Sequence, residues 1–181
     1  MSRSVDGGAY RGIGLALIVV FLAGTFVASA DSFEDGTMAQ RLFRIERSKN
    51  ANIVVYDARI KTDGRLDDRE PVVAYWLKLA EDGGYEKLSR LERRFAYGFK
   101  TQFADDNTLV LNMSAKIERE ITVDIRDGRS RALVDIDGRR SVLGKVYVES
   151  IERKLWPRVE FLELYGSDVA TGEETYERIY P

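Results

Sequence analysis

The sequence of 181 residues contains no cysteine and no histidine. Without cysteine the chain forms no disulfide, so its fold depends on a hydrophobic core. Without either residue type it has no serine–histidine or cysteine–histidine nucleophile pair, and no zinc site built from these ligands. The chemistry that remains would use carboxylates, lysine, tyrosine or an oxygen-liganded metal. We therefore expect no cofactor and favour a protein that is not an enzyme.

Neither sign of charge predominates, because 28 lysine and arginine residues stand against 30 aspartate and glutamate residues, for a net charge of −2. Neither sign forms a long block along the chain. The composition therefore predicts a surface of mixed charge. It gives no indication of a nucleic acid or an anionic membrane as partner.

The one long hydrophobic run lies near the N-terminus. Arg3 and Arg11 precede an apolar stretch at residues 13–27, and the small residues that end at Ala30 form a signal-peptidase pattern, with Asp31 as the first mature residue. The run is about 15 residues long, shorter than the roughly 20 that a membrane-spanning helix needs. This pattern predicts a cleaved signal peptide, and an uncleaved anchor is the alternative.

The expected organisation is a signal peptide at residues 1–30 followed by one domain at residues 31–181. The protein would then be exported to the periplasm or the extracellular space. No segment of the mature chain is apolar enough over a sufficient length to form a transmembrane helix.

Most of this domain alternates between apolar and polar residues, with Asp/Gly turns at short intervals, which is typical of antiparallel strands. Spacings of three and four between Tyr85, Leu88, Leu91 and Phe95 instead predict a helix at residues 86–94. The pattern predicts an all-β, mainly antiparallel fold, a barrel or curved sandwich of about nine strands with one inserted short helix. The expected strands are residues 42–47, 53–60, 72–79, 97–103, 109–117, 121–125, 132–136, 142–151 and 159–165.

Asp-Gly pairs recur in the chain at Asp63-Gly64, Asp127-Gly128 and Asp137-Gly138. The last pair lies in Asp135-Ile136-Asp137-Gly138, which has the form of a calcium loop. A calcium loop of the EF-hand type needs a glutamate at its twelfth position, which here is Val146. Because Asp-Gly is a preferred hairpin dipeptide, the pattern favours turns between strands over a metal site.

The stretch RIERSKNANIVVYD at residues 44–57 contains the main candidate site. Ser48, Asn50 and Asn52 are typical of turns whose side chains bond nearby backbone amides. A turn does not require the charged residues on either side, and Asp57 would lie opposite or diagonal to Arg44 in a hairpin. Neighbouring aromatic residues on a later strand could contact a ligand. The candidate ligand-binding residues are Arg44, Glu46, Arg47, Asn50, Tyr56, Asp57, Tyr75 and Trp76.

Four separated blocks resemble a bacterial family called domain of unknown function 4833. They are LFRIERSKNANIVVYD at residues 42–57, PVVAYW at 71–76, LSRLERRFAYG at 88–98 and PRVEFLELYG at 157–166. The blocks occur in order across the whole expected domain. The resemblance implies an exported β-rich domain, and supplies no activity, cofactor or catalytic residue.

Three functions remain open from the sequence. The first is a non-enzymatic exported domain that binds a small or lipid-like ligand within a barrel. The second is a module that binds an envelope protein by an edge strand or an exposed aromatic patch. The third is a carboxylate-dependent enzyme acting on a cell-envelope glycan, which would require two of Glu46, Lys49 and Asp57 to converge in a cleft.

Overall fold

The computed structural model describes residues 36–114, 119–151 and 158–180. The predicted signal peptide, with its cleavage site between Ala30 and Asp31, lies outside these residues. Among the described helices, none has the length and apolar character needed to cross a membrane.

The described chain forms eleven strands and one short helix, which confirms the predicted all-β fold. The neighbouring strands are antiparallel except for one parallel pair, β1 with β9. The elements are β1 (Met38–Arg47), β2 (Asn50–Ile60), β3 (Val72–Leu77), β4 (Tyr85–Lys87), α1 (Arg90–Phe95), β5 (Phe99–Asp105), β6 (Thr108–Met113), β7 (Ile121–Arg126), β8 (Arg129–Ile136), β9 (Arg139–Ile151), β10 (Arg158–Asp168) and β11 (Glu174–Ile179).

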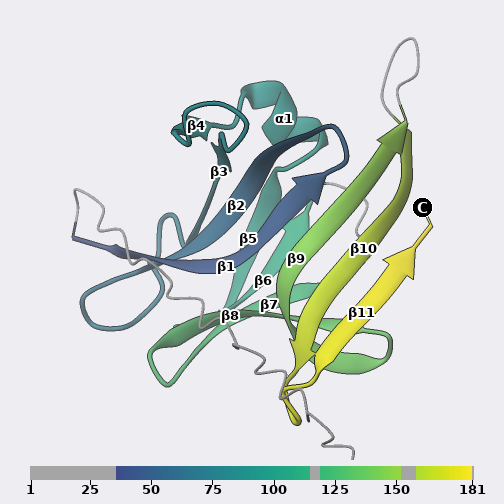
Figure 1. Cartoon of the computed structure of the whole chain (residues 1–181). Coiled ribbons are helices and arrows are strands. Elements are labelled where there is room, and N and C mark those ends of the chain that lie inside the picture. The colour runs from purple at the N-terminus through teal and green to yellow at the C-terminus, as the bar shows by residue number, and fades with distance from the viewer. Residues whose placement is uncertain (1–35, 115–118, 152–157, 181) are drawn as a thin grey trace, which may run out of the picture.

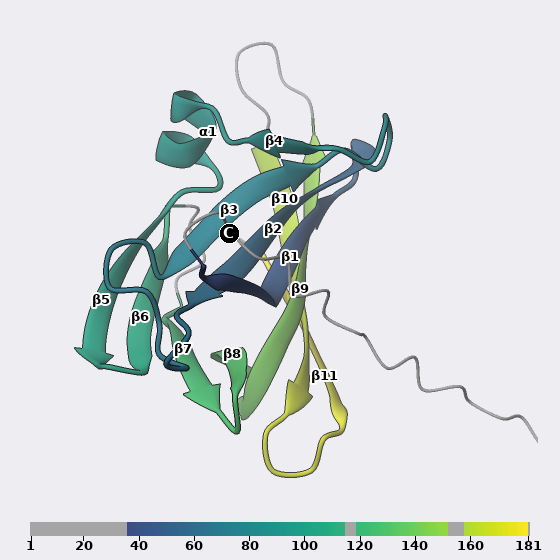
Figure 2. The same ribbon diagram turned by 90° about the vertical axis from the view of Figure 1, so that its left-hand side faces the viewer.

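The long strand β9 is the junction of the sheet. Its first residues pair with β8, residues 145–148 pair with β1, and β10 pairs along nearly its whole length. The strand order is therefore β4-β3-β2-β1-β9-β8-β7-β6-β5, with β10 and β11 added beside β9. The sheet curls on itself as half of a barrel, with β5 to β8 on one wall and β1 to β3 on another (Figures 1 and 2).

The inner face of this curled sheet is packed with side chains. The ring of Phe43 stacks on that of Tyr56, with centroids 4.4 Å apart, and Phe99 meets Tyr56 edge-on at 5.9 Å. The buried Tyr56 hydroxyl donates to the Tyr97 carbonyl oxygen at 2.8 Å. Aliphatic residues from eight strands, such as Leu111 and Val123, complete the core. Side chains thus occupy the interior of the half-barrel.

Two of the predicted Asp-Gly hairpins are confirmed. Asp127 and Gly128 have φ angles of 53° and 73°, and Asp137 and Gly138 have φ angles of 49° and 73°. Two consecutive residues with positive φ are the signature of the type I′ turn. The third pair, at Asp63, lies in a longer loop between β2 and β3. Within the described residues, no group of three or more acidic side chains could hold a metal ion.

The helix begins later than the sequence predicted. Residues Tyr85–Lys87 form β4 and pair with β3, because the chain is still extended there. Ser89 then starts α1 with a capping box, in which its side chain and that of Glu92 accept each other's backbone N–H groups. Leu88 is buried, but Leu91 and Phe95 are exposed. Of the predicted apolar stripe, only Leu88 packs on the core.

Residues after Tyr165, expected as a polar tail, continue β10 and form β11. In the first part of β11 the polar residues face inward and an aromatic residue faces solvent, the reverse of an ordinary amphipathic strand. Tyr176 is exposed, whereas the polar Thr175 is buried and Glu177 binds Arg119 through two hydrogen bonds of 2.5 and 2.6 Å. Because the polar residues face inward, the sequence pattern did not predict a strand.

Candidate functional site

The eight predicted site residues do not form one cluster. Arg44, Glu46, Asp57 and Tyr75 lie on the outer face of the sheet, since their neighbours in sequence belong to the core. The others lie on the inner side or at the β1–β2 turn: Arg47, Asn50, Tyr56 and Trp76.

Asp57 is a buried carboxylate on the outer face, with 3% of its surface exposed. It lies diagonal to Arg44, which is opposite Val55, and pairs instead with Arg41. The Tyr75 hydroxyl donates to the other oxygen of the same carboxylate. Burial, followed by this hydrogen bond, raises the pKa of Tyr75. Both carboxylate oxygens have donors, so Asp57 connects β1, β2 and β3.

Arg47 and Trp76 meet at the end of the half-barrel beside α1. The Arg47 guanidinium lies 4.5 Å from the Trp76 ring centroid and donates to the Tyr97 hydroxyl at 3.4 Å. The Trp76 indole N–H donates to Glu92 at 3.1 Å. Burial opposes ionisation of Glu92, but hydrogen bonds from Ser89 and Trp76 hold its pKa below the usual value. These contacts fix α1 to the sheet.

The polar turn has the predicted local geometry at Asn50, whereas Ser48 and Asn52 accept from backbone groups distant in the sequence. Asn50 accepts hydrogen bonds from the Asn52 backbone at 3.1 Å and from Arg47 at 3.2 Å. The Asn52 side chain donates to Glu81 at 3.0 Å and accepts from the Ala80 backbone at 2.8 Å. The turn residues therefore hold the loop between β3 and β4 in place.

A second group of residues, which sequence reasoning missed, covers the outer face of β1, β9, β10 and β11. Val146, Leu162 and Leu164 face the core, so the residues between them point outward. Strand pairing aligns these outward residues in rows across the four strands. We call this group the aromatic–charged face: Arg44, Lys145, Tyr165 and Tyr176 in one row, Glu46, Tyr147, Glu163 and Arg178 in the next, and Glu149, Phe161 and Tyr180 in the third.

Glu163 is at the centre of the aromatic–charged face and is 7% exposed. It accepts hydrogen bonds from Tyr165 at 2.7 Å, Arg178 at 2.6 Å and Tyr176 at 2.8 Å. These bonds, first from Tyr165 and then from Arg178, lower the pKa of Glu163 to about 2. The same contact raises the pKa of Tyr165 to about 12. A carboxyl with so low a pKa is charged at neutral pH and is a poor general acid.

Aromatic rings surround this carboxylate. The Tyr165 and Tyr176 centroids lie 5.2 Å apart, and the Phe161 and Tyr180 centroids lie 6.2 Å apart. The Lys145 ammonium lies 4.0 Å from the Tyr165 centroid. Tyr176 and Tyr180 are 45% and 69% exposed. Rings are thus accessible beside fixed polar groups.

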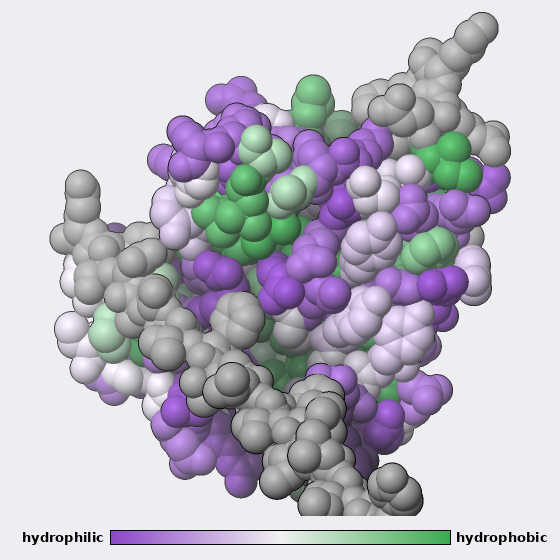
Figure 3. All heavy atoms as spheres, viewed as in Figure 1, coloured by the Kyte–Doolittle hydropathy of each residue, from purple (hydrophilic) through white to green (hydrophobic). Residues whose placement is uncertain are grey.

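The charges on this face are balanced, and its three cations all pair with Glu46 or Glu163. Three cations, Arg44, Lys145 and Arg178, stand against three glutamates. Glu46, for example, lies 2.7 Å from Arg44 and 3.6 Å from Lys145. Figure 3 shows polar and weakly polar residues over β9 and β10, beside a hydrophobic patch over β2 and β3. The face is therefore aromatic and polar without a net charge.

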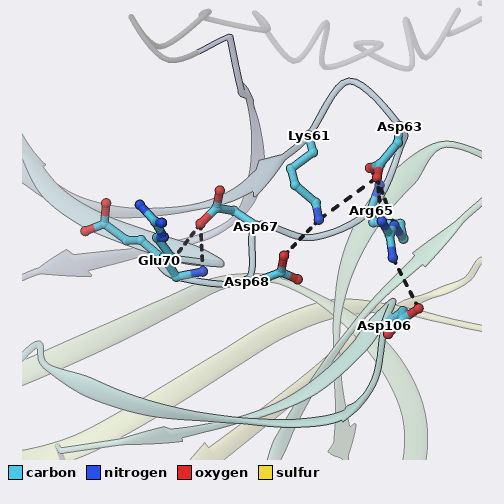
Figure 4. Close-up of polar contacts among 8 residues, drawn as sticks. Lys61, Asp63, Arg65, Asp67, Asp68, Glu70 and Asp106 are labelled. Carbon is cyan, nitrogen blue, oxygen red and sulfur yellow. Dashed lines mark hydrogen bonds and ion pairs between the residues drawn. The ribbon is translucent and has the colours of Figure 1, made fainter.

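A hollow of about 620 Å³ lies beside the loop between β2 and β3. Figure 4 shows that its acidic residues already have partners. Lys61 pairs with Asp68 at 3.0 Å, and Arg65 pairs with Asp63 at 2.8 Å. Asp67 accepts two backbone N–H groups at 2.8 and 2.9 Å. These contacts order the loop, and we assign no ligand to the hollow.

A family profile with the description "Domain of unknown function (DUF4833)" matches residues 43–178. The chain belongs to this family. The resemblance of the four sequence blocks to DUF4833 is thereby confirmed. The match includes every member of the aromatic–charged face except Tyr180. Comparison with curated proteins and with solved structures gives no match.

Proposed function

We propose that this protein is an exported, non-enzymatic binding domain, and that its aromatic–charged face binds a carbohydrate chain. The observation that carries the proposal is the set of exposed rings around Glu163, a carboxylate held by three donors. Sugar rings present apolar C–H faces that stack on aromatic rings. Their hydroxyl groups form strong hydrogen bonds with fixed charged side chains.

The charge balance of the face favours a carbohydrate of low charge. A polyanionic ligand such as a nucleic acid needs an excess of lysine and arginine. Here three cations lie among three glutamates, so long-range attraction for either sign is weak. A hydroxyl-rich ligand instead uses the donors and acceptors of both signs.

A ligand inside the barrel has less support. The interior position that a small or lipid-like ligand would need is occupied by side chains such as Phe43, Tyr56 and Leu111, all at most 1% exposed. The binding surface that we propose is therefore the outside of the sheet.

An enzymatic function also has less support. Asp57 and Glu46 are both paired with arginines on the outer face, rather than free in a cleft. Lys49 lies in the turn between β1 and β2. A carboxylate mechanism on a glycan would need two carboxyl groups with different protonation states across the bond.

Affinity electrophoresis tests the proposal directly. The purified protein would be run in gels that contain chito-oligosaccharides, soluble peptidoglycan fragments or neutral glucans. We expect at least one of these to retard migration, and Phe161→Ala or Tyr176→Ala to weaken binding about tenfold, as for a binding residue worth about 1.4 kcal/mol. Phe103→Ala is the control, since Phe103 is 38% exposed on β5.

Unchanged migration in all of these gels would contradict the proposal. So would equal retardation of the wild type and the Phe161→Ala variant, because the rings would then have no part in binding.

A second candidate, a module that binds an envelope protein, is favoured by the edge of β11. Among the described strands, β11 pairs only with β10, so its other edge has unpaired backbone groups. A partner strand could add there. Cross-linking from the exposed position 174 on β11 in intact cells would test this function, and a reproducible protein adduct would support it over carbohydrate binding.

A further inference from the structure

Large apolar side chains are exposed together at one end of the molecule. Leu91 is 67% exposed, Tyr85 63%, Phe95 60% and Leu79 52%. We call these four residues the apolar tip. They come from α1, from β4 and from the loop before β4. The exposure of Leu91 and Phe95 was unexpected, because their spacing predicted a stripe that would pack against the protein.

The tip protrudes from the sheet. Both views place α1, β4 and the loop between β3 and β4 at the same end of the molecule, opposite the turn between β10 and β11 (Figures 1 and 2). Leu91 and Phe95 are four residues apart, so they lie on the same side of α1. The helix has no buried residue. Its outer side is therefore available to a partner.

Contacts other than these apolar side chains hold α1 in place. Glu92 holds α1 to the sheet through Trp76, and the Ser89 capping box defines the first turn. Leu88, just before the helix, supplies the buried contact. Exposed apolar groups of this size that contribute nothing to the core often indicate an interaction surface.

The helix end of the tip is also cationic. Residues 87–95 hold four cations, Lys87, Arg90, Arg93 and Arg94, against one acid, Glu92, and none of the four pairs with a carboxylate in the described part of the chain. The acids nearby have other partners, since Glu81 in the loop with Leu79 pairs with Lys78 at 3.5 Å and Asp82 accepts from the Gly84 backbone at 2.8 Å. Glu86 pairs with Lys78 at 2.7 Å, and Glu92 accepts from the Ser89 backbone at 2.8 Å. The even charge of the whole sequence conceals this local excess.

We propose that the apolar tip binds the surface of a membrane that contains anionic phospholipid. Leu91 and Phe95 would enter the boundary between headgroups and acyl chains, while the four cations contact phosphate groups. Apolar side chains beside lysine and arginine are the combination that places a helix in this region. Each lysine or arginine close to an anionic membrane surface strengthens binding by about fivefold.

A lipid surface fits the tip better than an acidic protein. A standard protein interface takes about 20–30 residues from each partner. The tip has four apolar side chains on a protruding end, and a fluid bilayer adapts to such a shape. The proposal is independent of carbohydrate binding, because the tip and the aromatic–charged face share no residue.

The absence of cysteine permits a site-specific test. Leu91→Cys in the full chain would carry the only thiol and would be labelled with an environment-sensitive fluorophore. Val169→Cys is the matched control, since Val169 is 39% exposed and lies just after β10, at the opposite end. The probes are vesicles of phosphatidylglycerol and phosphatidylcholine in equal amounts, and vesicles of phosphatidylcholine alone.

We expect blue-shifted emission from position 91 with the anionic vesicles, at least about tenfold weaker binding to phosphatidylcholine, and no shift from position 169. Replacing Arg90 and Arg94 with glutamate should abolish the shift without unfolding α1, because both side chains are exposed. No shift at position 91, or equal shifts at both positions, would overturn the proposal. So would cross-linking of position 91 to an envelope protein with no response to vesicles.

Discussion

Asp57 illustrates how a single buried charge can organise three strands. Its carboxylate on β2 accepts from Arg41 on β1 and from Tyr75 on β3, and it is almost fully buried. A paired, buried charge becomes costly when its partner is neutralised, since the remaining ion has lost both water and counter-charge.

Asp57→Asn should therefore lower the free energy of unfolding by about 3 kcal/mol, because Arg41 would lose its partner charge. Urea denaturation would measure the change. Asp106→Asn is the matched control, since Asp106 pairs with Arg65 but its side chain is 81% exposed. We expect that variant to change stability by less than about 0.5 kcal/mol. Equal effects of the two variants would contradict a structural role for Asp57.

Glu163 makes a prediction about pH. Its pKa falls from the ordinary value of 4.5 to about 2 in the folded protein. The folded state then binds fewer protons than the unfolded state in this range. The stabilisation is complete above about pH 4.5 and is lost as the pH falls toward about 2. Urea unfolding between about pH 5 and about pH 3 should show a weaker pH dependence for Glu163→Gln than for the wild type.

Glu174→Gln removes an exposed carboxylate from the same pair of strands and serves as the control. If the wild type and Glu163→Gln lose stability in parallel as the pH falls, the hydrogen bonds to Glu163 do not stabilise its charge.

At the residue scale, the sequence predicted the turn better than the site. Asn50 forms the expected side-chain turn because its bond partner is two residues away. The partners of Asp57 were not predictable in the same way. A bulge between Arg41 and Phe43 shifts the register, and it places Arg41 rather than Leu42 opposite Asp57.

At the scale of elements, the sequence predicted those turns whose geometry depends on their own residues. The Asp-Gly dipeptides at Asp127 and Asp137 correctly located two hairpins, because positive φ is a property of the turn residues themselves. The short strand β4 and the last strand β11 were missed. Both exist because of hydrogen bonds to β3 and to β10, which sequence alternation does not report.

The junction of α1 and β5 depends on one glycine. A β-carbon on Gly98 would overlap the carbonyl oxygen of Arg93 in the helix. The Gly98 carbonyl also accepts from the Ser114 backbone at 2.7 Å, which limits how far the chain could move. Gly98→Ala should therefore lower the free energy of unfolding by about 3 kcal/mol.

Gly144→Ala is the matched control for this prediction. A β-carbon there would lie 3.8 Å from the nearest atom, the Tyr165 carbonyl oxygen, which is an ordinary contact. We expect that variant to change the free energy of unfolding by less than about 1 kcal/mol, as measured by urea denaturation. Equal stability of the two variants would show that the helix tolerates displacement.

At the scale of the whole molecule, the fold class followed from the sequence, but its assembly did not. Short turns between alternating segments correctly predicted an antiparallel, curled sheet with one helix. The parallel contact between β1 and β9 joins residues about 100 positions apart in the sequence. No local pattern encodes such a pairing, and yet it brings Arg44 and Glu46 beside the residues of β9.

That pairing also explains why the aromatic–charged face escaped sequence reasoning. Arg44 and Glu46 belong to the stretch that first drew attention, but Tyr147, Glu163 and Arg178 come from three later strands. The signal that could have located them is the alternation of charged or aromatic residues with aliphatic ones in β9 and β10. Such alternation is also typical of any sheet with one face in solvent.

The central claim is that the aromatic–charged face binds a carbohydrate. Its most direct test is a nuclear magnetic resonance titration of the purified protein with the carbohydrate that retards its migration most. We predict that backbone amide shifts concentrate on β1, β9, β10 and β11, at and beside Tyr147, Glu163 and Arg178. Shifts concentrated on the inward-facing Tyr56, Leu111 and Val123 would contradict binding on the outer face, and so would a spectrum that does not respond.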